Sequence, residues 1–99
     1  MKHFLLIYDY VPDYLDTRTP YRPEHFALAK AAEARGDLFL AGACTDEGTP
    51  LGVLVFKAAD RSLVEAFAKA DPYVVNGIVT NWSVREWTTV IGKDALTKV

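Results

Sequence analysis

The 99-residue chain has little of several residue types on which particular protein classes depend. It contains a single cysteine, Cys44, which excludes an internal disulfide and is compatible with a reducing compartment. Its only histidines are His3 and His25, and no group of Cys, His, Asp and Glu residues stands at metal-ligand spacing. It has no glycine-rich phosphate loop and no Gly-x-Ser-x-Gly turn. We therefore expect neither a metal site nor a cofactor.

The distribution of charged and apolar residues excludes further classes. The chain carries 11 basic and 13 acidic side chains, a formal net charge of −2, and no basic patch that would indicate a nucleic-acid partner. Its first apolar run meets Asp9 too soon for a signal peptide, and no later run approaches the ~18 apolar residues that indicate a membrane span. We expect a cytoplasmic protein with no membrane partner.

Length and composition are typical of one soluble globular domain. Hydrophobic residues make up 51% of the chain and charged residues 24%. We expect a single domain over residues 1–99, with its core at about 2–90 and a C-terminal tail at 91–99. A chain of this size buries only about two-thirds of its unfolded surface, so self-association would add to a modest core.

Hydrophobic periodicity predicts four strands and two helices. A loop at residues 11–18 leads to the first helix, which Thr19 caps, Pro20 begins and Gly36 ends. One apolar stripe of this helix contains His25, which we therefore expect to face inward. The strands are expected at residues 3–10, 37–44, 51–58 and 78–90.

The second helix is expected to begin at a capping box formed by Ser62 and Glu65 and to run to about Ala70. The Asp71-Pro72 step interrupts it, because the residue before a proline avoids the helical region. A short turn at residues 72–76 follows and leads into the last strand.

The predicted order is strand, helix, strand, strand, helix, strand, which is typical of a ferredoxin-like α+β sandwich with a four-stranded antiparallel sheet. Two helices cover only one face of such a sheet, yet the first three strands carry apolar residues on both faces. An uncovered apolar face marks an interface. We therefore expect a homodimer that forms through the open face of the sheet.

His25 and Asp71 are the ionisable residues that stand out. His25 lies on an apolar helical stripe and Asp71 at a break between helical segments. Histidine exchanges protons near neutral pH, and a carboxylate bonded to one ring nitrogen fixes its tautomer. A hydrogen-bonded core histidine and a helix-capping aspartate are the structural alternatives for the same two residues.

Other candidates give less specific signals. Cys44 has no basic neighbour in the sequence that would activate its thiol. Trp82 and Trp87 are expected on opposite faces of the last strand, as anchors of the core and of the interface. Tyr8 and Tyr10 on the first strand fit either a pocket lining or an interface.

Two short motifs resemble the YciI-like (YCII-related) family: residues 22–25, with the following Gly36 and strand 37–42, and residues 70–74, with the following Gly77 and long last strand. The resemblance covers about residues 2–88. It implies a dimeric ferredoxin-like α+β fold, similar to that of muconolactone isomerases and small cofactor-free monooxygenases.

The resemblance also implies site residues. The family's catalytic pair of a helix histidine and the aspartate of an Asp-Pro-Tyr motif matches His25 and Asp71 here. The family's best-defined chemistry is the dehydrochlorination of a chlorinated hydroxyhydroquinone, an elimination without a cofactor. The chain departs from the family at Ala43-Cys44, where many relatives have a proline, and at Asn76, where a small residue is common.

These features favour a small cofactor-independent enzyme that uses His25 and Asp71 for general acid/base chemistry, an elimination, isomerisation or hydrolysis, on a small aromatic or enol-type molecule. Arg22, Tyr8 and Tyr73 are expected to contact this substrate. Two alternatives stay open at this point. One is a non-catalytic metabolite-binding or accessory module, and the other is a structural dimer domain in which the His25–Asp71 contact only satisfies two buried polar groups.

Overall fold

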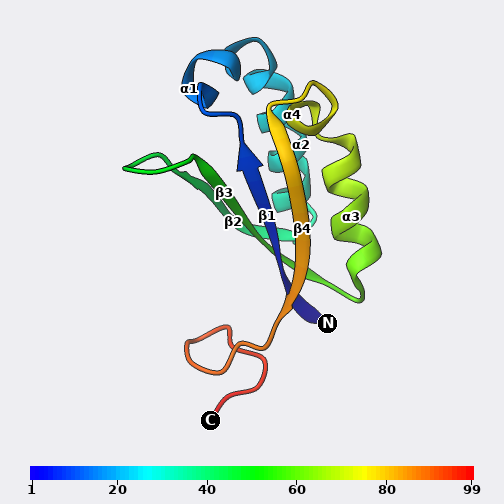
Figure 1. Cartoon of the computed structure of the whole chain (residues 1–99). Helices are drawn as coiled ribbons and strands as arrows, with labels where there is room; N and C mark the ends of the chain where they lie inside the picture. The colour runs from blue at the N-terminus through cyan, green and yellow to red at the C-terminus, as the bar shows by residue number, and fades with distance from the viewer.

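Four antiparallel strands form the sheet of this protein, and helices cover one of its faces (Figure 1). The structure, a computed structural model, describes all residues, 1–99. The strands stand side by side in the order β2-β3-β1-β4. Their bounds are β1 Lys2–Tyr10, β2 Leu38–Cys44, β3 Leu51–Ala58 and β4 Val79–Trp87.

Along the chain, the helices and strands follow one another in the predicted order, so the ferredoxin-like α+β sandwich is confirmed. None of the helices combines the length and the apolar character that a membrane crossing demands. Their bounds are α1 Tyr14–Thr17, the 3-10 turn η1 Thr19–Tyr21, α2 Arg22–Ala34, α3 Arg61–Ala70 and α4 Pro72–Val75.

The central strand β1 shows why the helices pack on one face. Its alternate residues Phe4, Leu6, Tyr8 and Tyr10 are each at most 4% exposed, and they belong to the core that the helices complete. Helix α3 adds Val64, Phe67 and Ala68 to this core. The core therefore sits between the helices and one face of the sheet.

The start of the first long helix differs from the prediction. Thr19 does not cap it; Thr19 and Pro20 form the separate turn η1, which the Tyr21 N–H closes by donating to the Arg18 carbonyl (3.0 Å). Helix α2 then begins at Arg22 without a side-chain cap. It ends before Gly36, as expected, and Gly36 adopts the positive φ of 85° that favours glycine.

The capping box predicted for α3 is wrong. Asp60 is the N-cap in an extended conformation, and its carboxylate accepts hydrogen bonds from the backbone N–H (2.9 Å) and the hydroxyl of Ser62. These bonds lower the pKa of the Asp60 carboxyl group. A carboxylate at a helix N-terminus also meets the positive end of the helix dipole, which explains why Asp60 rather than Ser62 is the cap.

The last strand, β4, is shorter than predicted, because its pairing with β1 ends at Trp87. The last pair joins His3 to Trp87, and the predicted extension to Val90 pairs with no strand. Residues 88–99 leave the sheet as a looped tail (Figure 1). Thr89 Oγ1 of this tail lies 2.8 Å from His3 Nδ1, which ties its start to the sheet.

The face of the sheet away from the helices is largely apolar. Trp87 pairs with His3 on this open face and is 45% exposed, whereas Trp82 pairs with Tyr8 on the helix side, so the two tryptophans lie on opposite faces as predicted. The strand pairing places further apolar side chains on the open face: Leu5, Ile7, Leu40, Leu51, Val53 and Val55.

Candidate active site

Helix α2 carries His25 on the side that faces the sheet. Ala32, two turns along, is fully buried, and Leu28 between them packs against the core. This is the apolar stripe that the sequence predicted, and His25 is only 9% exposed. A histidine in this position needs a polar partner for the ring nitrogen that points into the protein.

Asp71 is that partner. It ends α3 and caps α4, and the following Pro72 holds it in an extended conformation (φ −68°, ψ 122°), as the Asp-Pro step predicted. Its side chain is fully buried. The carboxylate accepts hydrogen bonds from His25 Nδ1 (2.9 Å), the Tyr8 hydroxyl (2.8 Å) and the Tyr73 backbone N–H (3.0 Å). The capping role and the contact with His25 are thus combined in one residue.

This contact defines the chemistry of the His25 ring. A carboxylate accepts hydrogen bonds and does not donate, so Nδ1 of His25 carries a proton and Nε2 is the nitrogen left to a bound molecule. When Nε2 takes up a proton, the buried carboxylate 2.9 Å from Nδ1 stabilises the charge of the ring. His25 is therefore equipped to act as a general acid and base.

Two tyrosines surround the His25–Asp71 pair. The ring of Tyr73 stacks on that of His25, with centroids 4.0 Å apart and planes 9° apart, and holds the imidazole ring in place. Burial raises the pKa of the Tyr8 hydroxyl, and the negative charge of Asp71 raises it further. The hydroxyl therefore stays a hydrogen-bond donor. Tyr8 keeps donating to Asp71 at a pH where an exposed tyrosine has ionised.

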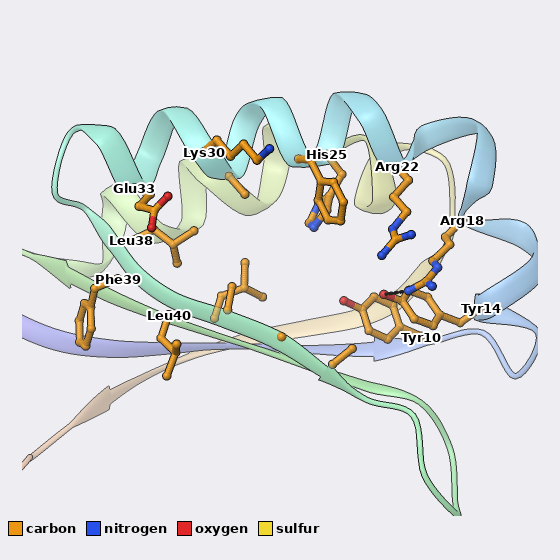
Figure 2. Close-up of a pocket in the computed structure, with 16 residues that line it drawn as sticks. Tyr10, Tyr14, Arg18, Arg22, His25, Lys30, Glu33, Leu38, Phe39 and Leu40 are labelled. Atoms are coloured by element: carbon orange, nitrogen blue, oxygen red, sulfur yellow. Dashed lines mark hydrogen bonds between the residues drawn. The ribbon is translucent and has the colours of Figure 1, made fainter.

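A pocket of about 450 Å³ opens beside His25, between α2 and β2 (Figure 2). Its apolar wall is formed by Phe26 and Ala29 of α2 and by residues of the sheet: Leu38, Ala41, Gly42, Ala43 and Leu54. Phe39 and Leu40 of β2 also border the pocket, with side chains turned away from α2 (Figure 2). Its polar groups are Tyr10, Tyr14, Arg18, Arg22, His25, Lys30 and Glu33. A cavity of this size and character fits a small, largely apolar molecule with a few polar groups.

Two of the predicted site residues line this pocket and three lie behind it. His25 and Arg22 are in its wall, whereas Asp71 is buried behind His25. Tyr8 and Tyr73 are at most 1% exposed and do not reach the pocket. The structure therefore does not place these two tyrosines for the substrate contact expected of them; they support Asp71 and His25 instead.

Sequence reasoning left open whether Tyr10 lines a pocket or an interface, and it missed the lining residues Tyr14 and Arg18. The rings of Tyr10 and Tyr14 stack, with centroids 3.9 Å apart, where α1 folds back over the end of β1. Arg18 donates a hydrogen bond to the Tyr14 hydroxyl (3.1 Å), shown dashed in Figure 2. The four-residue spacing of Tyr14 and Arg18, typical of neighbours on a helix, was the one signal available for them.

No three His, Cys, Asp or Glu side chains are grouped so that they would hold a metal ion. The polar groups that line the pocket are two guanidinium groups, one ammonium, one carboxylate, one imidazole and two phenols. This set suits the recognition of an organic molecule by charge and hydrogen bonds.

One solved structure shares the fold closely. It is a 5-chloro-2-hydroxyhydroquinone dehydrochlorinase (TftG) from Burkholderia phenoliruptrix in complex with 2,5-dihydroxybenzoquinone, with a TM-score of 0.76, 21% identity, and coverage of 94% of this chain and 98% of that one. Rv0793 from Mycobacterium tuberculosis aligns more weakly, with a TM-score of 0.49, 13% identity, and coverage of 93% of this chain and 97% of that one.

A search of the curated proteins finds no match to this chain. A family model does match, that of the YCII-related domain, and it spans residues 1–88, which include every strand, every helix and both members of the His25–Asp71 pair. The match ends at residue 88, directly after the last residue of β4, where the tail begins. The chain therefore belongs to the YCII-related domain family.

Proposed function

We propose that this protein is a small cofactor-independent enzyme that uses His25 as a general acid and base on a small aromatic or enol-type molecule. The observation that carries the proposal is the position of His25. Its ring forms part of the pocket wall, while its Nδ1 is held 2.9 Å from a fully buried carboxylate. A structural histidine needs the carboxylate but has no need of a pocket.

In this proposal, Nε2 of His25 takes a proton from the bound molecule and later returns it to another atom or to a leaving group. Asp71 is a positioning residue, since it fixes the tautomer of the ring and stabilises its charged form. Tyr73 and Tyr8 position this pair in turn. Elimination, isomerisation and hydrolysis all use such a proton transfer.

Two observations support a planar, oxygen-bearing substrate. The pocket, of about 450 Å³, has an apolar wall and polar groups at its ends, so it suits a single ring with oxygen substituents. The structurally similar dehydrochlorinase is in complex with 2,5-dihydroxybenzoquinone, which is a molecule of that kind.

The test compares wild-type protein with His25→Gln on a panel of phenolic and enol compounds. Product formation and proton exchange with deuterated solvent are followed by NMR, and binding by calorimetry. We expect His25→Gln to lose turnover by about 10²–10⁴-fold while it keeps most of its binding. Equal turnover by wild type and variant would contradict the proposed role of His25.

The same panel separates the alternatives. If the wild type turns over none of the compounds and His25→Gln still binds them, the results would favour a metabolite-binding module. A His25→Asn variant that loses stability, in a protein that binds none of the compounds, would favour a purely structural pair.

We also propose that the protein is a homodimer through the open face of its sheet. Leu5, Ile7 and Val53 lie side by side on this face, where they are half-buried, and no helix packs on it (Figure 1). Ile7→Glu should place a charge in this interface and give a monomer. Light scattering at micromolar concentration tests this, and a monomeric wild type would contradict it.

We propose a cytoplasmic location for this dimer. Cys44, the one cysteine, is exposed as a free thiol at the end of β2, and such a thiol is best preserved in a reducing compartment. Cell fractionation with an antibody against the protein tests this location, and recovery from an oxidising compartment would contradict it.

A further inference from the structure

Two arginines share one end of the pocket with His25. Arg18 reaches it from the segment after α1, and Arg22 from the first turn of α2 (Figure 2). Neither has a carboxylate partner, because the ion pairs of the structure join Lys2 to Glu86, His25 to Asp71 and Arg35 to Asp37. The positive charge at this end of the pocket is therefore left unneutralised by the protein.

Aromatic rings hold both guanidinium groups in place. The Arg18 guanidinium lies over the Tyr14 ring and that of Arg22 over the Phe26 ring, each 4.8 Å from the ring centroid. A stacked guanidinium keeps its N–H donors at its edges, and only one donor of Arg18 is used, by the Tyr14 hydroxyl. Both groups are thus oriented before a ligand arrives, which lowers the entropy cost of binding.

The pocket also differs in charge from the rest of the protein. Three cationic side chains, Arg18, Arg22 and Lys30, line it against one acidic side chain, Glu33. The whole chain has a formal net charge of −2. Glu33 lies at the opposite end from the two arginines (Figure 2). A locally positive cleft on an acidic protein attracts anions and orients them with their charge toward the arginines.

We propose that Arg18 and Arg22 form an oxyanion-binding subsite, and that the ligand of this pocket is a small organic anion. Its carboxylate or phenolate oxygens bind the two guanidinium groups, and its apolar body lies along Phe26 and Leu38 toward β2. This inference rests on the proposed function in that it places the anionic group next to His25. The atom that exchanges a proton with His25 is then within a few bonds of that group.

Calorimetry at low salt with simple probes tests this subsite without a known substrate. Benzoate, 4-nitrophenolate and the uncharged benzamide are titrated into the wild type, Arg18→Gln/Arg22→Gln and the matched control Arg35→Gln. Arg35 lies at the far end of α2 in an exposed ion pair with Asp37. Melting curves establish that each variant is folded, and Arg18→Lys/Arg22→Lys keeps the charge but loses the planar fork.

We expect at least one anion to bind more tightly than benzamide, and the double glutamine variant to lose about 10–100-fold in affinity for it, as charged hydrogen bonds predict. The lysine variant should lie between the two, and Arg35→Gln should bind like the wild type. Benzoate alone would identify a carboxylate as the preferred group and 4-nitrophenolate alone a phenolate. Equal affinity for benzamide, no binding of either anion, or full affinity in the glutamine variant would overturn the proposal.

A His25→Gln variant separates this inference from the proposed function. The arginines hold the anion independently of His25, so the variant should bind it nearly as tightly as the wild type. Anion binding that depends on the arginines, in a protein without turnover, would keep the subsite and refute the catalytic role of His25. Turnover that depends on His25 but not on the arginines would support the catalytic role of His25 and refute the subsite.

Discussion

The imidazole ring of His25 lies flat on the phenol ring of Tyr73, with centroids 4.0 Å apart and planes only 9° apart. The two residues come from different helices, α2 and α4, and the same α4 begins at the capping residue Asp71. One short helix thus supplies both the hydrogen-bond acceptor and the stacking surface for the ring. This arrangement predicts that Tyr73 acts on His25 through its ring and not through its hydroxyl.

Tyr73→Leu and Tyr73→Phe test this prediction as a matched pair. Leucine removes the stacked ring from a site that is 1% exposed, so we expect a loss of about 2–4 kcal/mol in the free energy of unfolding and a lower turnover. Phenylalanine keeps the ring and removes only the hydroxyl, so we expect a loss of at most about 1 kcal/mol. Denaturant unfolding measures both, and a large loss in Tyr73→Phe would show that the hydroxyl matters after all.

Asp71→Asn changes one atom in a buried site and should be costly. Asp71 receives three hydrogen bonds, from His25, Tyr8 and the Tyr73 backbone, and an amide nitrogen in place of one oxygen would face at least one of these donors. We expect a loss of about 3 kcal/mol in the free energy of unfolding, as for other broken buried pairs, together with a loss of turnover.

Asp60→Asn is the control for this substitution. Asp60 also accepts hydrogen bonds at a helix start, but it is exposed, and asparagine caps helices about as well as aspartate. Urea unfolding of both variants should therefore separate them clearly. Similar stabilities would contradict the role we assign to the buried carboxylate.

The tyrosines around the pair predict how stability depends on alkaline pH. Burial raises the pKa of Tyr8 and Tyr10, and raises the pKa of Tyr73 to about 12, so each stays neutral in the folded protein when an unfolded tyrosine, with a pKa of about 10, has ionised. The folded state then binds more protons than the unfolded state. Stability is fully present below about pH 10 and falls as the pH rises toward the pKa values of the folded state.

Tyr8→Phe isolates one contribution to this fall. The variant should be less stable at neutral pH by about 1–2 kcal/mol, because Asp71 loses a donor. Its stability should then fall less steeply above pH 10, by up to about 1.4 kcal/mol per pH unit relative to the wild type. Urea unfolding between neutral and alkaline pH measures both slopes, and parallel slopes would show that Tyr8 ionises in the folded state.

Local patterns predicted the fold and singled out His25 and Asp71 one by one, whereas their pairing was implied by the resemblance to the YCII-related family. Strand alternation placed Tyr8 on the same face as Leu6, and the Asp71-Pro72 step fixed the break between α3 and α4, because both signals are contained in a few consecutive residues. The predicted order of elements is confirmed for the same reason.

The pocket was harder to predict because it depends on contacts between distant segments. Tyr14 and Arg18 belong to a segment without a strong periodicity, and only its path over the end of β1 brings them to Tyr10. Alternation identified the face on which Tyr8 lies but not its depth. Tyr8 was therefore expected at the substrate, whereas it is fully buried against Asp71.

Gly52 supports the pocket from the neighbouring strand. It pairs with Tyr8 across β1 and β3, and a Cβ atom at this position would collide with the hydroxyl and ring of Tyr10, which lines the pocket. Gly52→Ala must therefore displace Tyr10 and the ring of Tyr14 that stacks on it. We expect a loss of about 1–3 kcal/mol in the free energy of unfolding, the usual cost of overpacking, and weaker binding of pocket ligands.

Gly42→Ala in the monomeric Ile7→Glu background is the matched control, because Gly42 lies on the adjacent strand β2 and a Cβ atom there meets nothing within 4 Å in its own chain. It should be at least as stable as Ile7→Glu alone, since alanine restricts the unfolded chain. Tyr10→Phe removes the hydroxyl, the atom nearest to the added carbon, so the double variant Gly52→Ala/Tyr10→Phe should recover part of the loss. Additive losses in this double-mutant cycle, measured by urea unfolding, would show that Gly52 does not act through Tyr10.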